Sequence, residues 1–344
     1  MFNQGFQSVS CWCRFTGFQR IKAFALVVLC LLSQACTTIA TPGNPAVPAH
    51  TFVFSDGGEA IFYTLDKAPW SAAPQPAPPA PRNVLFVVAG SGCQSMGRFL
   101  PGYFTGLEGE SGATRIFILH KRFISPASEA DHCSDAFVRA DHLSQWQSDQ
   151  HEFIVQQLAQ LTQQGVHPLR IALLGISEGA ELVPLLAREI PAVTHIALLS
   201  HSGMAAFDVY AALAARYPHM QKGWLQLQQA LANRPADQDA MRIHGRSWRY
   251  WAELRDLHPQ ANLLATCLPV LIAVGDADSL IPPNAPDRLQ ADLFAAGKHD
   301  VSVLHFPDAD HGLRADGRHY LPDFMHQMDL WLEREKQEIS CIKM

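Results

Sequence analysis

Short apolar runs alternate with amphipathic stretches along the chain from residue 83 onward. Within each run, apolar residues follow one another instead of alternating with polar ones. Such a strand is typical of a parallel sheet that is buried on both faces, because both of its sides then meet apolar neighbours. We therefore expect strands at 84–89, 115–119, 170–174, 195–199, 270–274 and 301–306.

Helical stretches occupy the segments between these runs. They are expected at 143–161, 180–189, 286–296 and 322–335. A regular alternation of strands and helices is typical of a doubly wound α/β domain, since each helix carries the chain back to the start of the next parallel strand. The pattern therefore predicts a mostly parallel sheet with helices on its faces.

One long interval interrupts this alternation. Residues 203–262 hold no apolar strand run, and helical stretches at 218–232 and 245–257 fill much of the interval. We therefore expect a helical cap insertion that lies over the edge of the sheet. The insertion contains three tryptophans, Trp224, Trp248 and Trp251.

Two β-rich runs precede the core. Residues 51–54 and 59–64 lie on either side of Asp56-Gly-Gly, a pattern that predicts a hairpin. Segments rich in Pro and Ala at 37–50 and 68–82 cannot form regular ladders, because proline lacks the N–H donor. We interpret the first segment as a linker and the second as an extended connection to the core.

The first residues have the pattern of an export signal. Arg14, Arg20 and Lys22 precede an apolar run at 23–32, and no acidic residue accompanies them. The run is about 10 residues long, which is too short for a membrane helix of roughly 20 residues. Small residues follow it, so the segment is typical of a secretory signal that is cleaved just before Cys36. An uncleaved signal that anchors the chain in the membrane is the alternative.

The cysteine at the expected cleavage site allows a further interpretation. Ser33-Gln-Ala-Cys36 resembles the box of bacterial lipoprotein signals, in which the cysteine is lipidated and becomes the new N-terminus. That box has a Leu-like residue three positions before the cysteine, whereas this chain has Ser33 there and Leu32 one step further away. Plain secretion is therefore the first expectation, and a lipid tether through Cys36 is the second. Both predict a protein of the periplasm or cell envelope.

These patterns together predict a division of the chain. The signal peptide is expected at 1–35, the linker, hairpin and Pro-rich extension at 36–82, the α/β core at 83–202 and 263–337, the helical cap insertion at 203–262, and a tail at 338–344.

Composition and charge narrow the functional classes. The 344 residues are 48% hydrophobic and 17% charged, which provides ample material for a large core. The formal net charge is −6, and the sequence has no basic stripe. We expect no nucleic-acid partner, because phosphate binding needs clustered Lys and Arg.

The cysteines suggest a disulfide and no metal site. Four of the 8 cysteines lie in or beside the signal. The other four, Cys93, Cys133, Cys267 and Cys341, allow three pairings in an exported domain. We favour Cys93 with Cys133, because both flank the predicted start of the core. No Cys or His spacing is typical of zinc, so we expect neither a metal nor a cofactor.

Ser177 has the sequence context of a catalytic nucleophile. Gly175-x-Ser177-x-Gly179 follows a predicted strand and precedes a predicted helix. In a nucleophile elbow the serine occupies a strained turn between strand and helix, and the glycines let the backbones pass closely. A chance glycine-rich turn would also contain this bare pattern, but the position between strand and helix favours the elbow.

A serine hydroxyl is a weak nucleophile at neutral pH, so it needs a base, and that base needs an acid to orient it. In elbow folds the acid and then the histidine follow the serine, each at the carboxyl end of a strand. Asp276 and Asp278 both follow the run at 270–274 and qualify as the acid. The alternative for either is a turn-forming residue that caps the local backbone.

His311 qualifies as the base, because it follows the last predicted strand and precedes the last predicted helix. Asp308 and Asp310 could orient it instead of the acids above, but side chains so close in sequence rarely face one another. His305 lies inside the last apolar run, so we expect it to be buried and structural.

Stabilisation of the oxyanion needs two backbone N–H groups. We expect one from Glu178, which directly follows the nucleophile. The other should come from the glycine-rich loop after the first core strand, with Ser91 as the first candidate and Gly92 as the alternative. Taken alone, this loop could equally be a tight turn.

Three motifs together resemble the α/β-hydrolase superfamily. Gly-Ile-Ser177-Glu-Gly looks like its elbow, Gly-Asp-Ala-Asp278-Ser-Leu-Ile-Pro like its acid loop, and Asp-Ala-Asp-His311-Gly like its histidine loop. The resemblance covers about residues 83–337, and it favours Asp278 over Asp276 as the acid. The elbow, the insertion and the C-terminal motif look most like the dienelactone-hydrolase and prolyl-oligopeptidase-like branch.

The resemblance implies a serine hydrolase without a cofactor. That branch contains carboxylesterases, thioesterases and peptidases, so we expect cleavage of an ester-type acyl bond in a small ester or short peptide through an acyl-enzyme. A serine peptidase, an acyltransferase and a non-catalytic envelope binding protein are the alternatives. The insertion at 203–262 is expected to form one wall of the substrate pocket, and its Trp and Leu content favours an apolar acyl or aromatic group in the substrate. One position departs from the superfamily, which usually has His-Gly in the oxyanion loop where this chain has Ala89-Gly90. The departure weakens inference about the substrate.

Overall fold

The structure is a computed structural model that describes residues 47–69, 80–130 and 132–333. The predicted signal peptide, Cys36, most of the Pro-rich extension and the tail lie outside these residues, so they stay predictions. Within the described ranges, no helix combines the length and the apolar character that crossing a bilayer requires.

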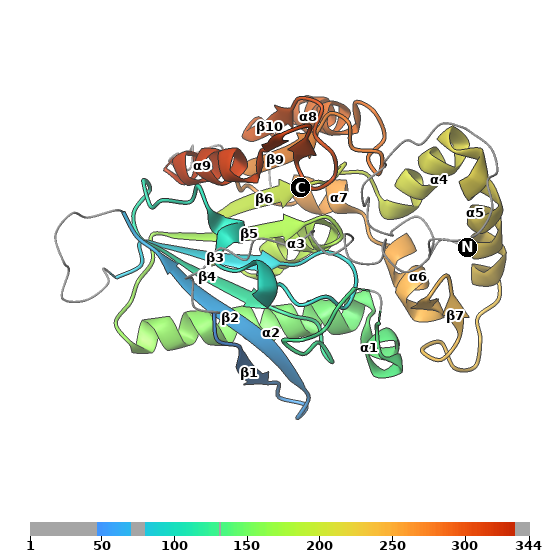
Figure 1. The fold of residues 1–344 in the computed structure, drawn as a ribbon, viewed down its shortest axis with the longest axis horizontal. Coiled ribbons are helices and arrows are strands. Elements are labelled where there is room, and N and C mark those ends of the chain that lie inside the picture. Colours follow the sequence, from blue (N-terminus) through green and yellow to red (C-terminus); the bar gives the residue numbers. More distant parts are fainter. Residues whose placement is uncertain (1–46, 70–79, 131, 334–344) are drawn as a thin grey trace, which may run out of the picture. The chain divides into compact units, whose positions relative to one another are not determined.

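The described residues form one eight-stranded sheet in the order β1-β2-β4-β3-β5-β6-β9-β10 (Figure 1). Strand β2 pairs antiparallel with β1 and β4, and the other pairs are parallel. The strands are β1 His50–Val53, β2 Glu59–Lys67, β3 Asn83–Val88, β4 Thr114–Leu119, β5 Arg170–Ile176, β6 His195–Leu199, β9 Val270–Gly275 and β10 Val301–Phe306. This topology confirms the predicted fold class, including the N-terminal hairpin.

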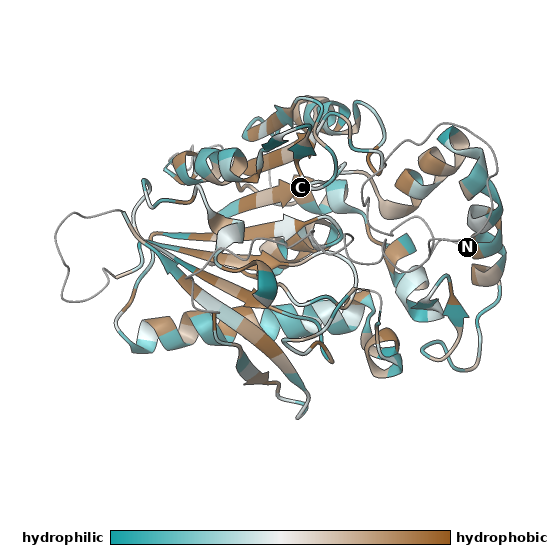
Figure 2. Cartoon of the chain, viewed as in Figure 1, coloured by the Kyte–Doolittle hydropathy of each residue, from teal (hydrophilic) through white to brown (hydrophobic). Residues whose placement is uncertain are grey.

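Helices cover the sheet because its central strands are apolar on both faces. Every residue of β3, β6 and β9 is buried. One face packs against α2 (Leu143–Gln163), α3 (Gly179–Glu189) and α8 (Ala285–Ala295), and the other packs against α9 (Leu321–Leu332). Figure 2 shows this contrast between largely apolar central strands and helices of mixed hydropathy.

Strand β10 departs from the prediction of burial on both faces. Only its first and last residues, Val301 and Phe306, are buried, and His305 is exposed. The reason is its place at the end of the strand order, where a single neighbour, β9, covers it. An apolar run therefore predicted the strand correctly but not its burial.

Several short elements have no periodicity that the sequence could reveal. Helix α1 (Asp135–Ala140) has only six residues, and its first turn is capped by the Ser134 side chain, which accepts a hydrogen bond from the Phe137 N–H. The others are the 3₁₀ helices Gly97–Phe99 and Gly102–Phe104 and the two-residue strands β11 (Arg314–Ala315) and β12 (Arg318–His319).

The cap, residues 203–262, is mostly helical and lies beyond the carboxyl ends of β5 and β6 (Figure 1). Its helices are α4 (Ala206–Arg216), α5 (Pro218–Leu231), α6 (Trp248–Arg255) and the start of α7 (Pro259–Leu264). The expectation that this interval holds no strand is wrong, because β7 (Arg242–Ile243) and β8 (Arg246–Ser247) form a small hairpin. Strands of two residues leave no apolar run in the sequence.

The cap tryptophans pack in the hydrophobic interior of the cap. Trp248 and Trp251 are buried in a hydrophobic cluster of the cap, and Trp224 packs against it. Their indole N–H groups donate to the carbonyl oxygens of Ala230 and Ile243, at 3.1 and 2.8 Å respectively. Trp content therefore reflects the packing of the cap and gives no support to an apolar or aromatic substrate group.

A disulfide joins Cys93, in the loop after β3, to Cys133, just before α1. The two Cα atoms are 5.4 Å apart, and the bond confirms the favoured pairing. Buried Ile124, Phe137 and Val138 surround it. The bond therefore fixes one end of the predicted oxyanion loop to a packed part of the core.

Replacing Cys93 and Cys133 together by serine is expected to lower the free energy of unfolding by about 4 kcal/mol. The cross-link closes a loop across a sequence separation of 40, and its loss gives that loop full freedom in the unfolded chain. Urea unfolding of both proteins, each free of reductant, measures the difference. Equal unfolding midpoints would show that the bond has no such role.

Candidate active site

Ser177 lies on the sharp turn between β5 and α3 with a positive φ of 52°. Its N–H donates to the Leu199 carbonyl oxygen at 2.8 Å, which ties the turn to β6. A Cβ at Gly179 would collide with the Val88 carbonyl oxygen, and one at Gly175 would collide with the backbone of Ala180. Both glycines are therefore required by close backbone approach, as in an elbow.

The three residues predicted as nucleophile, base and acid meet at the carboxyl edge of the sheet. His311 Nε2 is 2.8 Å from Ser177 Oγ, and His311 Nδ1 is 2.7 Å from Asp278 Oδ2. Ser177 follows β5, Asp278 follows β9 and His311 follows β10. Because parallel strands end at the same edge, folding brings together side chains that lie 134 and 33 positions apart.

The Asp278 carboxylate is held from two sides. Its side chain is only 1% exposed, and its Oδ1 accepts a hydrogen bond from the Leu280 N–H at 2.8 Å. Its other oxygen is left to face the His311 ring. A buried carboxylate in this position orients an imidazole and stabilises its cation.

The loop that carries His311 is shaped by Asp310 and Ser200. Asp310 Oδ1 accepts hydrogen bonds from the backbone N–H groups of Gly312 and Arg314, so it does not orient the imidazole. The Ser200 hydroxyl donates to the His311 carbonyl oxygen at 2.7 Å. Sequence reasoning missed Ser200, although its position directly after the apolar run of β6 was a signal of the same kind as for Asp278.

His305 is exposed, so the expectation of a buried structural histidine is wrong. Its Nδ1 is 2.8 Å from Asp276 Oδ1, and its Nε2 is 3.1 Å from Asp287 Oδ1. Asp276 thus binds the His305 side chain and does not contact His311 in the bonds described. Burial opposes the charge of the imidazole, but the bonds to the two aspartates outweigh it, so the pKa of His305 is raised above 6.5.

The raised pKa of His305 predicts a loss of stability as pH rises. Its charged form contributes stability that is fully present below about pH 6.5, the unfolded value, and disappears as pH passes the higher folded pKa. The contribution should be below about 1 kcal/mol, because solvent screens a side chain that is 39% exposed. Melting temperatures of His305→Gln and the native protein should converge above that pKa and differ below it. A constant difference across the range would contradict this assignment.

The loop after β3 lies directly against the elbow. A Cβ built on Gly90 would be 3.2 Å from the Ile176 carbonyl oxygen and 3.4 Å from Ser177 Cβ. Ser91 follows at this edge, and Glu178 follows Ser177. The oxyanion role of their N–H groups stays a prediction, and it returns below as part of a proposal.

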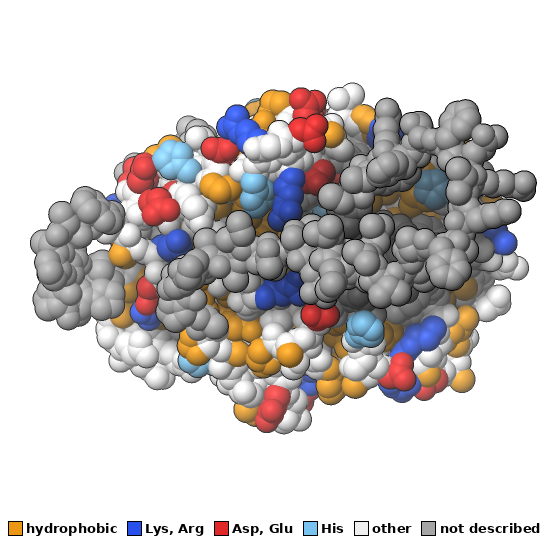
Figure 3. All heavy atoms as spheres, viewed as in Figure 1, with side chains coloured by type: hydrophobic (Ala, Val, Ile, Leu, Met, Phe, Trp, Pro, Cys, Tyr) orange, Lys and Arg blue, Asp and Glu red, His pale blue; other side chains and the backbone are white. Residues whose placement is uncertain are grey.

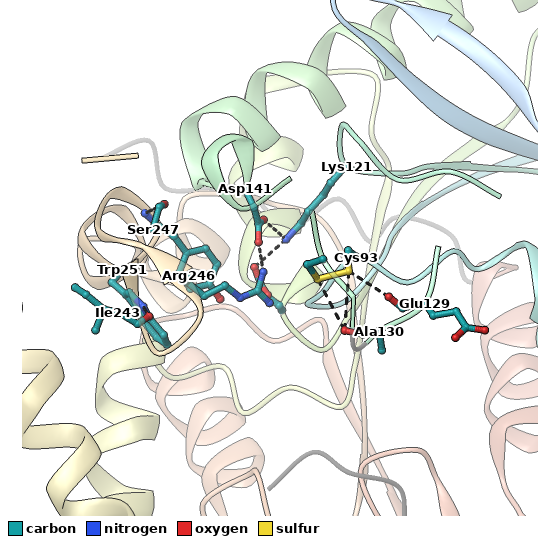
Figure 4. A network of polar contacts seen from close by, with 12 residues as sticks. Cys93, Lys121, Glu129, Ala130, Asp141, Ile243, Arg246, Ser247 and Trp251 are labelled. Carbon is teal, nitrogen blue, oxygen red and sulfur yellow. Dashed lines mark hydrogen bonds and ion pairs between the residues drawn. A yellow bond between two sulfur atoms is a disulfide. The ribbon is translucent and has the colours of Figure 1, made fainter. Parts of the chain in front are cut away.

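A buried group of charges beside the elbow was not predicted. Lys121, Asp141, Glu178 and Arg246 form what we call the elbow ion cluster. Lys121 Nζ is 2.7 Å from Asp141 Oδ1 and 3.0 Å from Glu178 Oε1. Arg246 donates to the other Asp141 oxygen. Figure 4 shows Asp141 between Lys121 and Arg246, with the Cys93 disulfide nearby. Lys121 follows a strand, but nothing in the sequence pairs it with residues from two distant segments.

The other charged side chains that the structure describes form no group of metal ligands and no basic patch on the face in view. Across the described residues, no three His, Cys, Asp or Glu side chains are grouped so that they could hold a metal ion. On the described part of the face in Figure 3, Lys and Arg side chains are scattered among acidic and apolar ones.

A family model described as the prolyl oligopeptidase family matches residues 132–337, which is more than half of the chain. No curated protein matches the sequence. The family match confirms the resemblance that the elbow, acid-loop and histidine-loop motifs predicted.

Solved structures share the fold at low identity. Est1E from Butyrivibrio proteoclasticus has 16% identity and a TM-score of 0.51, over 83% of this chain and 98% of its own. The Pyrococcus horikoshii acylaminoacyl peptidase has 15% identity and a TM-score of 0.54, over 86% of this chain and 43% of its own. A Mycobacterium tuberculosis puromycin-hydrolyzing peptidase has 17% identity and a TM-score of 0.54, over 87% of this chain and 41% of its own. This chain thus matches less than half of either peptidase.

Proposed function

This chain belongs to the prolyl oligopeptidase family of serine hydrolases, and from that premise we propose that it cleaves an acyl ester with Ser177 as nucleophile. His311 is the general base, and Asp278 orients it. The observation that carries the proposal is that one imidazole contacts both partners, at 2.7 and 2.8 Å. In a neutral imidazole one nitrogen donates and the other accepts. Donation from Nδ1 to Asp278 leaves Nε2 free to accept the Ser177 proton.

The proposed reaction proceeds in two halves. Ser177 Oγ attacks the ester carbonyl carbon as His311 Nε2 takes its proton, and the N–H groups of Glu178 and Ser91 stabilise the tetrahedral oxyanion. The intermediate collapses when the ester C–O bond breaks and the leaving alcohol takes the proton from His311. Water then gives a proton to His311 and attacks the acyl-enzyme. Collapse releases the carboxylic acid, and Ser177 recovers its proton.

The share of each solved structure that this chain matches favours an ester over a peptide as the substrate. The chain matches almost all of Est1E, a structure of which is described with ferulic acid bound, but less than half of each peptidase. The second candidate is a serine peptidase on the same fold, which the description of the matching family favours.

Matched substrates separate these two candidates. A p-nitrophenyl ester and a p-nitroanilide of one acyl group differ only in the bond that is cleaved. We expect turnover of the ester with a series of acyl groups, no measurable turnover of the anilides, including N-acyl aminoacyl anilides, and loss of the ester reaction in Ser177→Ala. Cleavage of N-acyl aminoacyl anilides that is lost in Ser177→Ala would identify a peptidase, because the activated ester is intrinsically more reactive and both kinds of enzyme cleave it.

We also propose that the protein is exported to the periplasm or cell envelope, with a lipid tether at Cys36 as the alternative to plain secretion. The Cys93–Cys133 disulfide supports export, because such bonds persist in oxidising compartments. Cell fractionation of the native protein and Cys36→Ser tests both ideas. A soluble cytosolic product would contradict export, and equal membrane association of the two proteins would contradict lipidation.

A further inference from the structure

We propose that Arg246, Lys121 and Asp141 are positioning residues for the elbow, and that docking of the cap through Arg246 is required for efficient oxyanion stabilisation. The inference rests on the proposed function, because it concerns the N–H group of Glu178. Its starting point is that the side chain of this same residue belongs to the elbow ion cluster.

The contacts form a continuous chain from the cap to the elbow. Arg246, on β8 of the cap, donates to one oxygen of Asp141, which lies between α1 and α2. The other Asp141 oxygen accepts from Lys121 Nζ at 2.7 Å, and Lys121 also donates to Glu178 Oε1 at 3.0 Å. Asp141 and Lys121 therefore link Arg246 to Glu178, and a shift of Arg246 would move the Glu178 side chain through them.

Burial restricts these contacts to few alternative arrangements. Asp141 is 2% exposed and Lys121 is 8% exposed. The Lys121 ammonium also lies 3.9 Å from the centre of the Trp146 ring. A buried charge that loses its partner is strongly destabilised, so buried ion pairs tolerate few alternative arrangements. The cluster therefore holds the side chain of Glu178, the residue between the nucleophile and the first residue of α3.

The charge balance of the cluster gives a second, electrostatic reason why the loss of Arg246 should slow the reaction. Two cations, Lys121 and Arg246, face two anions, Asp141 and Glu178. Removal of the Arg246 charge leaves a net negative charge in a buried region next to the elbow. Negative charge there opposes the oxyanion that forms in the reaction, and a low dielectric strengthens this effect. The loss should therefore appear in the chemical step.

The second predicted oxyanion donor is tied to the same place. Ser91 lies two residues before Cys93, whose disulfide leads to Cys133 just ahead of α1. Asp141 directly follows α1 and caps its C-terminus, where its N–H donates to the Phe137 carbonyl oxygen. Helix α1 thus connects the disulfide of one donor loop with the ion cluster of the other. Contacts at both of its ends therefore hold this short helix in place.

Two other polar contacts between the cap and the core are more exposed. Glu253 of the cap accepts hydrogen bonds from the N–H and hydroxyl of Ser144, at 2.7 and 2.8 Å. Arg139 pairs with Asp237 at 3.3 Å on the surface. Neither pair touches Lys121 or Glu178 in the contacts described, so Arg246 is the cap residue that joins the cluster.

The test compares Arg246→Gln, Arg246→Lys and a control, Arg242→Gln. Arg242 is on the same hairpin and also reaches α1, where it donates to the Asp135 carbonyl oxygen at 3.4 Å, but it does not join the cluster. For each protein, kcat and KM are measured with one p-nitrophenyl ester. The inhibition constant of a trifluoromethyl ketone with the same acyl group reports on a tetrahedral oxyanion.

We expect Arg246→Gln to lower kcat by about 10- to 100-fold, with KM changed by less than about threefold. The inhibition constant should rise by the same factor as kcat falls. Arg246→Lys, which keeps the charge, should recover part of both, and Arg242→Gln should match the native protein. If Arg246→Gln does not fold, the parallel change of kcat and inhibition constant in Arg246→Lys decides the matter.

A loss that appears mainly in KM would contradict the inference, because it would show that the cap only shapes the substrate pocket. Unchanged kcat in Arg246→Gln, or equal losses in Arg242→Gln, would contradict it as well. Failure of the proposed function is distinguishable, since then the native protein would hydrolyse no ester or Ser177→Ala would retain the activity.

Discussion

Replacing Ser177 by alanine is expected to lower kcat by about 10⁴- to 10⁶-fold with no loss of folding. The substitution removes the oxygen that faces His311 Nε2 at 2.8 Å. It leaves the elbow backbone in place, because the turn is fixed by Gly175, Gly179 and the hydrogen bond to Leu199. Steady-state hydrolysis of a p-nitrophenyl ester measures the effect, and thermal unfolding verifies the fold.

The matched control for this substitution is Ser202→Ala. Ser202 is also buried near the carboxyl edge of the sheet, but its hydroxyl accepts a hydrogen bond from the Met204 N–H and does not contact His311 in the structure. We expect its kcat to stay within about threefold of the native value. Retention of native activity by Ser177→Ala would refute the assignment of the nucleophile.

Replacing Asp278 by asparagine is expected to lower kcat by about 10⁴-fold. An amide can donate to Nδ1 of His311 and thereby favour the tautomer that carries its proton on Nε2. In that tautomer Nε2 cannot accept the Ser177 proton. The same ester assay measures the loss, which should appear in kcat because the substitution changes the base and leaves the pocket intact.

Asp276→Asn is the matched control, since Asp276 comes from the same loop and qualified equally before the family resemblance was considered. Its carboxylate is 45% exposed and contacts His305, whose other bond goes to Asp287. Activity should therefore stay close to native. A large loss in Asp276→Asn with little effect in Asp278→Asn would exchange the roles of the two aspartates.

The sheet was predictable because its central strands are buried on both faces. Burial of this kind requires a continuous apolar run, and such runs gave β3, β5, β6 and β9 with boundaries within one or two residues. The edge position of β10 was not predictable in the same way. A run shows that a strand is apolar, but the number of its neighbours depends on the order of strands in the folded sheet.

Ser177, Asp278 and His311 could be predicted because each follows an apolar strand at a fixed point of a known motif. The elbow ion cluster could not, because its members come from four separate segments. Lys121, Asp141 and Arg246 have no shared spacing, and their pairing depends on how α1 and the cap dock. The cap tryptophans cannot be interpreted from the sequence for a related reason, since burial inside the cap and exposure to a pocket favour the same residue type.

The most direct test of the central claim is labelling with a fluorophosphonate probe followed by peptide mapping. The account predicts one labelled peptide that contains Gly175 to Gly179, with the probe on the Ser177 oxygen. Labelling should fall strongly in Asp278→Asn and disappear in Ser177→Ala. A probe attached to another residue, or a folded native protein that takes up none, would contradict the claim that His311 activates Ser177.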